Sequence, residues 1–176
     1  MKGLIIYKGK YGATRQYANW VAQELNLPVI AADENEGSIS GFNLLVIGTS
    51  VYMGKLLIIP WLKQNLSALN GKKLYLFMVA GTPAEEKQKL NLYTLGIPEE
   101  IRNQCEIYFL PGRLIKKKLS FRDRITLSMA AKLTKDPASK KIMMDDYNNV
   151  RIENIAGLVN AVKKFFASQN ETVQIA

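Results

Sequence analysis

The chain has 176 residues, of which 48% are apolar and 22% charged, and this composition indicates one globular domain with a sizeable core. It contains no histidine and a single cysteine, Cys105, which excludes Ser-His-Asp and Cys-His catalysis, histidine-built metal sites, cysteine-ligated clusters and an internal disulfide. We therefore expect a bound organic cofactor to carry any chemistry, while the formal net charge of +9 predicts an anionic partner.

Short apolar runs alternate with amphipathic segments of helical length along the chain. The apolar runs predict five strands, at residues 4–7, 28–31, 44–47, 74–79 and 107–110. The amphipathic segments predict helices at residues 14–25, 55–66, 84–104 (with a break at residues 96–98) and 151–167. Strands that alternate with helices pair in parallel through right-handed crossovers. The pattern therefore predicts one α/β domain over residues 1–170, with a five-stranded parallel sheet of order 2-1-3-4-5, helices on both faces, and a polar tail at residues 171–176.

Residues 112–150 do not fit this alternation, since two to six residues would suffice to connect the fifth strand to the last helix. The segment holds ten Lys/Arg and four Asp/Glu, so it carries +6 of the net charge of +9. We interpret it as a basic insertion before the last helix. Residues 120–123, Ser-Phe-Arg-Asp, have the pattern of a capping box, which predicts a helix from about residue 121.

Apolar residues recur at every fourth position of this expected helix, and basic residues surround them. The apolar positions are Phe121, Ile125, Met129 and Leu133. Basic and apolar residues on one segment are typical of a membrane-surface element, so residues 113–135 predict contact with an anionic membrane or a membrane quinone. An insertion that covers the sheet edge with solvated lysines is the alternative. Nucleic acid is a weaker prediction, because the aromatic residues are not spaced as a stacking platform.

The sequence carries no signal for export or for membrane insertion. No apolar run reaches the ~18 residues of a membrane span, and the first residues lack the apolar region and cleavage site of a signal peptide. A lone cysteine also suits a reducing compartment. We therefore expect a cytoplasmic protein, peripheral to the inner face of the membrane if it contacts one. The sequence leaves its oligomeric state open.

In an open parallel sheet, ligands bind beyond the carboxyl ends of the strands, and here three segments follow those ends. The first segment, residues 8–14, contains two glycines that let backbone N–H groups approach an anion, and the next helix adds its positive N-terminal end. Thr14 can offer a hydroxyl to that anion. An ordinary strand-to-helix turn, with Thr14 as a plain helix cap, is the alternative.

The second segment, residues 48–55, has a superficial likeness to a Walker A loop. Five residues separate its glycines where that motif has four, and Leu56 stands where the motif has Ser or Thr, so we exclude a nucleotide triphosphatase. Small Thr49 and Ser50 would instead allow close approach of a flat ring, on which Tyr52 could stack. A half-buried surface tyrosine is the alternative for Tyr52. The third segment, residues 79–83, would form the far wall of the same pocket.

These three segments together resemble the flavodoxin-domain family, which binds flavin mononucleotide (FMN). The first loop of that family reads Ser/Thr-x-Thr-Gly-x-Thr; Gly12 and Thr14 retain this pattern, while Gly9 and Tyr11 replace two hydroxyl residues. The resemblance implies a flavodoxin-like fold, FMN as the cofactor, no metal, and the flavin rather than any side chain as the reacting group. The cofactor-binding residues it implies are Lys8, Gly9, Lys10, Tyr11, Gly12, Ala13, Thr14, Thr49, Ser50, Val51, Tyr52, Met53, Gly54, Val79, Ala80, Gly81 and Thr82.

A narrower likeness is to the menaquinone-dependent protoporphyrinogen oxidases, a branch of the flavodoxin-like proteins. The segments "KYGAT" and "GTSVYMGK" and the basic insertion carry it. This resemblance implies an oxidoreductase whose flavin takes electrons from a porphyrinogen and passes them to a quinone. A one-electron carrier flavodoxin, or a flavodoxin-fold module without activity, stays open as an alternative. Lys8, Lys10 and Lys55 favour the enzyme, because positive charge near the ring stabilises an anionic reduced flavin.

Overall fold

Five parallel strands form the centre of the molecule in the computed structural model, which describes residues 2–34, 39–83 and 85–174. The strands are β1 (Gly3–Lys8), β2 (Val29–Ala31), β3 (Leu44–Tyr52), β5 (Lys73–Ala80) and β6 (Cys105–Pro111). They pair in the order β2-β1-β3-β5-β6, and the short β4 (Lys55–Leu56) pairs antiparallel with the end of β3. Without β4 in the count, this is the predicted order 2-1-3-4-5, so the flavodoxin-like fold is confirmed.

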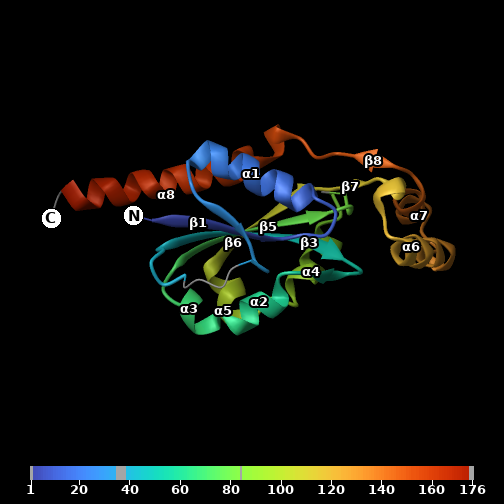
Figure 1. Cartoon of the computed structure of the whole chain (residues 1–176), viewed down its shortest axis with the longest axis horizontal. Helices are drawn as coiled ribbons and strands as arrows, with labels where there is room; N and C mark the ends of the chain where they lie inside the picture. Colours follow the sequence, from blue (N-terminus) through green and yellow to red (C-terminus); the bar gives the residue numbers. More distant parts are fainter. Residues whose placement is uncertain (1, 35–38, 84, 175–176) are drawn as a thin grey trace.

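Helices cover both faces of the sheet, as Figure 1 shows. One face carries α1 (Ala13–Leu25) and α8 (Ala156–Gln174), which follows the short η2 (Ile152–Ile155). The other face carries α2 (Ile59–Gln64), α3 (Leu66–Leu69), α4 (Lys87–Thr94) and α5 (Glu99–Gln104). The continuous apolar runs of β3 and β5 are buried on both faces, which is why these strands lie in the middle of the sheet.

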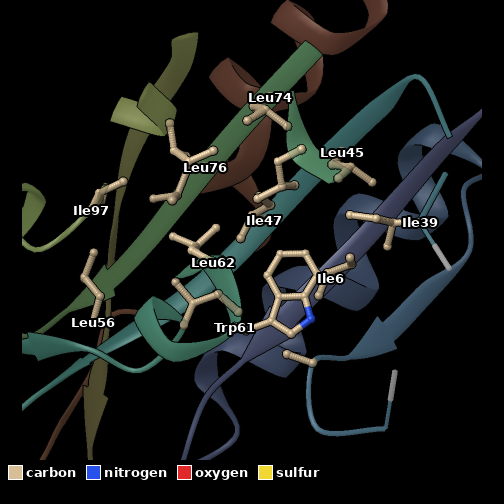
Figure 2. Packing of buried hydrophobic residues seen from close by; sticks show 14 of the residues in the cluster. Ile6, Ile39, Leu45, Ile47, Leu56, Trp61, Leu62, Leu74, Leu76 and Ile97 are labelled. Atoms are coloured by element: carbon tan, nitrogen blue, oxygen red, sulfur yellow. The ribbon is translucent and has the colours of Figure 1, made fainter. Parts of the chain in front are cut away.

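Two apolar clusters hold the helices to the sheet. Figure 2 shows the first, where Trp61 and Leu62 of α2 pack on Ile47 and Leu76 of the central strands. The second lies under α1 and α8 and is built around Tyr17, Phe77 and Leu158. Gly48 is required there, because a Cβ at this position would lie 2.2 Å from the ring of Phe77. The sheet therefore has a rigid base from which its carboxyl ends project.

Two element boundaries differ from the sequence-based expectation, and a third element divides at the break that was expected. The helix predicted at residues 55–66 begins only at Ile59, because residues 55–56 belong to β4 and Pro60 suits the first turn of a helix. Helix α8 continues to Gln174, so the predicted polar tail is helical as far as the structure describes it; residues 175–176 lie outside the described residues. The helix predicted at residues 84–104 divides into α4 and α5 around the expected break, and residue 84 lies outside the described residues.

The basic insertion forms a separate layer at one end of the sheet (Figure 1). Its elements are β7 (Arg113–Leu114), η1 (Lys116–Lys118), α6 (Phe121–Leu133), α7 (Pro137–Met144) and β8 (Tyr147–Asn148). Strands β7 and β8 pair antiparallel, and α6 packs on α7. The Ser120 hydroxyl accepts a hydrogen bond from the Asp123 N–H at 3.2 Å, which confirms the predicted helix start. No helix within the described ranges is long and apolar enough to cross a bilayer.

Candidate functional site

A cavity of about 440 Å³ lies beyond the carboxyl ends of the parallel strands, where the sequence predicted a ligand site. The three expected segments form three of its walls, and the insertion forms the fourth. The predicted residues that line it are Lys10, Tyr11, Ala13, Thr14, Ser50, Val51, Tyr52, Met53, Gly54, Val79, Ala80 and Gly81. The structure places the other predicted residues, Lys8, Gly9, Gly12, Thr49 and Thr82, outside this lining.

The first wall is the turn between β1 and α1, and it leaves polar groups without partners. Gly12 precedes the helix with φ 82°, and neither a side-chain cap nor an acidic residue in the first turn satisfies the N–H groups there. Thr14 follows within the helix, so the alternative in which it is a plain helix cap is wrong. Its side chain is 1% exposed, and its Oγ1 has no hydrogen-bond partner among the described residues. An anion at this helix start would satisfy both the N–H groups and the hydroxyl.

Arg113 brings a positive charge to the same place from the insertion. Its Nη1 donates to Gln16 Oε1 at 2.8 Å, and its Nη2 donates to the Tyr11 carbonyl at 3.5 Å. A Cβ on Gly12 would lie only 3.2 Å from Nη2. Both acceptors are uncharged, so these bonds orient the guanidinium without balancing its charge. Arg113 was not predicted from the sequence, where its only signal is that it directly follows the Pro-Gly that ends the fifth strand.

The second wall is a β-hairpin rather than the loop that the sequence suggested. Strand β3 extends to Tyr52, and Met53 (φ 49°) and Gly54 (φ 75°) turn the chain into β4, with two positive φ angles as in a type I′ turn. Ser50 lines the cavity, and its buried Oγ has no hydrogen-bond partner among the described residues. Thr49 is fully buried on the other side, where its Oγ1 accepts a hydrogen bond from the Ile58 N–H at 3.2 Å.

A polar network ties these two walls to the insertion. Asp123, near the start of α6, forms an ion pair with Lys10 at 2.7 Å and accepts a hydrogen bond from the Tyr52 hydroxyl at 2.7 Å. It also accepts one from the Tyr11 hydroxyl, while Lys10 Nζ donates to the Tyr52 hydroxyl at 2.9 Å and lies 4.1 Å from the centroid of that ring. Lys10, then Tyr11 and Tyr52, hold the pKa of Asp123 well below its ordinary value. The same carboxylate raises the pKa of Lys10.

This network changes the predicted electrostatics of the site. Asp123, which the sequence analysis missed, balances the charge of Lys10. Lys8 also has an acidic partner, Asp33, at 2.6 Å. The charges of three lysines were expected to stabilise an anionic reduced flavin. Two of these lysines are thus paired with carboxylates.

The remaining walls are close-packed and largely apolar. The Gly112 N–H donates to the Ala80 carbonyl at 2.7 Å, and a Cβ on Gly81 would lie 2.1 Å from the Tyr147 hydroxyl oxygen. Burial raises the pKa of Tyr147, which keeps its phenol neutral. The faces that α6 and α7 turn to the cavity carry mainly apolar side chains, namely Leu127, Ala130 and Met143. Thr82, predicted for the third wall, instead bonds to the Tyr93 hydroxyl at 3.0 Å.

The cavity has neither a histidine nor a cysteine for acid–base or nucleophilic chemistry. The chain has no histidine, and Cys105 starts β6, at the opposite end of the sheet. Burial raises the pKa of the Cys105 thiol to about 11, so it is a packing residue rather than a nucleophile. Within residues 2–34, 39–83 and 85–174, no cluster of acidic or cysteine side chains could hold a metal ion. The arrangement suits a bound anionic ligand with a flat, largely apolar body.

The sequence and the fold both resemble those of known proteins. The sequence matches the model of the flavodoxin domain family over residues 4–141. A search of curated proteins finds no match. Similar solved structures include a flavodoxin, WrbA-like protein from Agrobacterium tumefaciens (16% identity, 61% of this chain and 82% of that chain, TM-score 0.43). They also include an archaeal flavodoxin (16% identity, 75% and 98%, TM-score 0.40) and an FMN-dependent NADH-azoreductase from Bacillus anthracis (9% identity, 94% and 99%, TM-score 0.49).

Proposed function

The chain belongs to the flavodoxin domain family, and from that premise we propose that it binds FMN in the cavity and acts as an FMN-dependent oxidoreductase. The observation that carries the proposal is the buried hydroxyl of Thr14, which lies without a partner beside the uncapped start of α1. A polar atom buried in this way costs about 1–3 kcal/mol unless a ligand satisfies it. A phosphate group is the ligand that a helix start of this kind binds best.

The other residues of the cavity fit the rest of FMN. Arg113 would supply a cation for the phosphate. The unpaired Ser50 hydroxyl, on the second wall of the cavity, would supply a hydrogen-bond partner for another part of FMN. The volume of about 440 Å³ falls within the range of roughly 300–1,000 Å³ that small-molecule sites have. When bound, FMN supplies one- or two-electron transfer. The chain's own residues would anchor the phosphate, fix the ring between the hairpin and the end of β5, and exclude water with the insertion.

We propose further that the electron donor or acceptor is a large apolar molecule, as in the quinone-linked protoporphyrinogen oxidases. Leu127, Ala130 and Met143 present an apolar surface to the cavity, which suits a flat hydrophobic molecule better than a water-soluble protein partner. The lysine charges no longer support this choice, because Asp123 and Asp33 balance Lys10 and Lys8. The proposal therefore rests on the apolar surface that Leu127, Ala130 and Met143 present to the cavity.

Reconstitution tests the cofactor. Purified protein titrated with FMN should quench the flavin fluorescence, and mass analysis of the cofactor released on denaturation should give the mononucleotide rather than the dinucleotide. Protein that stays colourless and leaves the fluorescence unchanged would overturn the proposal.

Turnover tests the reaction. The FMN-loaded protein should oxidise protoporphyrinogen to fluorescent porphyrin under anaerobic conditions when a menaquinone analogue is present, and FMN-free protein is the matched control. Tight FMN binding together with a stable one-electron reduced state and no porphyrin formation would instead identify a carrier flavodoxin.

A further inference from the structure

Helix α6 exposes a row of large apolar side chains on the surface of the molecule. Phe121 is 70% exposed, Ile125 45%, Met129 59% and Leu133 80%, and the four follow each other at every fourth position. Single exposed apolar residues are normal, but a continuous row along one helix marks an interaction surface. Figure 1 shows α6 and α7 together at one end of the molecule, beyond the ends of the central strands.

The opposite face of α6 already contacts the rest of the protein, so the exposed row is not the face by which the helix packs on the protein. Ala131 is 3% exposed, Leu127 and Ala130 line the cavity, and Asp123 holds the start of the helix to the first two walls. The helix is therefore fixed to the protein by one face and presents a second apolar face to its surroundings.

Basic side chains share this outer face and its margins. Arg122 and Lys132 lie among the apolar positions, and Lys117 and Lys118 are exposed just before the helix. The whole insertion carries a net charge of +6. Long basic side chains can bury their stems and keep their charges in a polar layer, which is what an interfacial helix requires. Two copies of this surface would repel each other because both are positively charged. In an anionic bilayer, by contrast, the lipid headgroups match the charge of the surface, and the acyl layer matches the apolar row.

We propose that the outer face of α6, defined by Phe121, Ile125, Met129 and Leu133 with Arg122 and Lys132, docks on an anionic lipid bilayer. The inference goes beyond the proposed function, since this face lies outside the cavity and does not touch the flavin site. Because the other face of α6 is a wall of the cavity, docking places the cavity about one helix diameter, ~10–12 Å, from the lipid. A molecule dissolved in the acyl layer then has a short path to the site.

Vesicle sedimentation of the full chain tests the proposal, with phosphatidylcholine vesicles that contain or lack phosphatidylglycerol. Wild-type protein should sediment only with the anionic vesicles, and the bound fraction should fall as salt rises. The double variant Arg122→Gln/Lys132→Gln should bind about 30-fold more weakly, since two cationic side chains leave the lipid surface. The double variant Phe121→Ser/Leu133→Ser should bind at least ~10-fold more weakly because its apolar anchor is removed.

The matched control is Leu92→Ser/Leu95→Ser, which removes two leucines of similar exposure, 62% and 64%, from another part of the surface. This control should bind vesicles as the wild type does. All variants change exposed positions, so their melting temperatures and FMN uptake should equal those of the wild type. If the wild-type protein fails to bind FMN, the vesicle assay still tests lipid docking, because it does not depend on the cofactor. Wild-type protein that stays in the supernatant, or a control variant that loses as much binding as the α6 variants, overturns the proposal. Light scattering that shows a dimer lost in Phe121→Ser/Leu133→Ser overturns it too, because the face would then belong to a second copy.

Discussion

Replacing Asp123 with asparagine should loosen the insertion from the rest of the site. The carboxylate of Asp123 is the common partner of Lys10, Tyr11 and Tyr52, and it is the point where α6 meets the first two walls. Asparagine keeps the shape and one acceptor oxygen but removes the charge. The change therefore isolates the electrostatic part of the network from its packing.

The structure sets the size of the effect. Hydrogen bonds to a charged group contribute about 1.5–3 kcal/mol, against about 0.5–1.5 kcal/mol for neutral ones, so each affected bond weakens by roughly 1 kcal/mol. The side chain of Asp123 is 12% exposed, but that of Lys10 is 38% exposed, and solvent screens the ion pair accordingly. We expect Asp123→Asn to lower the free energy of unfolding by about 1–2 kcal/mol at neutral pH.

The pH dependence of this loss identifies its cause. The pKa of Asp123 in the folded protein lies below its ordinary value of about 3.9, so the network contributes its full stability above that pH and loses it as the pH falls further. The difference between wild type and Asp123→Asn should therefore be constant near neutral pH and shrink below pH ~4.

Urea unfolding followed by circular dichroism at several pH values measures both quantities. The matched control is Asp33→Asn, which breaks the Lys8 ion pair at 2.6 Å, where the acidic side chain is 70% exposed. An exposed pair contributes little, so this control should cost less than about 0.5 kcal/mol. The reasoning is refuted if the two variants are equally stable, or if the loss in Asp123→Asn is unchanged at pH ~3.

Three further substitutions probe single contacts of the cavity. Thr14→Val should raise the Kd for FMN about 10- to 100-fold in a fluorescence titration without destabilising the FMN-free protein, because the hydroxyl it removes is unpaired; an unchanged Kd would contradict the phosphate role. Arg113→Gln should weaken FMN at least ~5-fold and leave riboflavin, which has no phosphate, unaffected, so an equal loss for both ligands would speak against a phosphate contact. Gly81→Ala should lower the unfolding free energy by about 1–3 kcal/mol, and Tyr147→Phe in the same chain should recover most of it, because the clash is with the hydroxyl oxygen.

The sheet and three walls of the cavity were predictable because they follow from local patterns. Each apolar run is long enough for one strand, and parallel strands bring their carboxyl ends to one edge, so three segments distant in sequence had to meet. Ser50 and Thr14 both line the cavity at this edge. Thr49 was grouped with them, although successive residues of a strand face opposite sides. Had the strand been extended past residue 47, this alternation would have assigned Ser50 to the cavity and Thr49 to the interior.

The fourth wall was not predictable, because nothing local sets where an insertion folds. Arg113 and Asp123 reach the cavity through contacts with Gln16 and Lys10, each about a hundred residues away in the chain. The capping pattern identified the start of α6 but not the direction of its faces. The hairpin turn was also weakly marked, since Met53-Gly54 is a poorer signal than Asn-Gly for two residues with positive φ.

The insertion completes the cavity but, among the described residues, contributes only Val150 to the two apolar clusters that hold the helices to the sheet. Among the described residues, neither apolar cluster contains a side chain between Leu110 and Val150. The Asn149 N–H donates to the Gly112 carbonyl at 3.1 Å, so the insertion leaves the domain and returns to it at the same point. The sheet is thus complete without the insertion. Without it, however, the cavity would lose Arg113, Asp123 and the apolar wall formed by Leu127, Ala130 and Met143. One segment therefore supplies the fourth wall of the cavity, and one helix of that segment, α6, faces both the cavity and the surroundings.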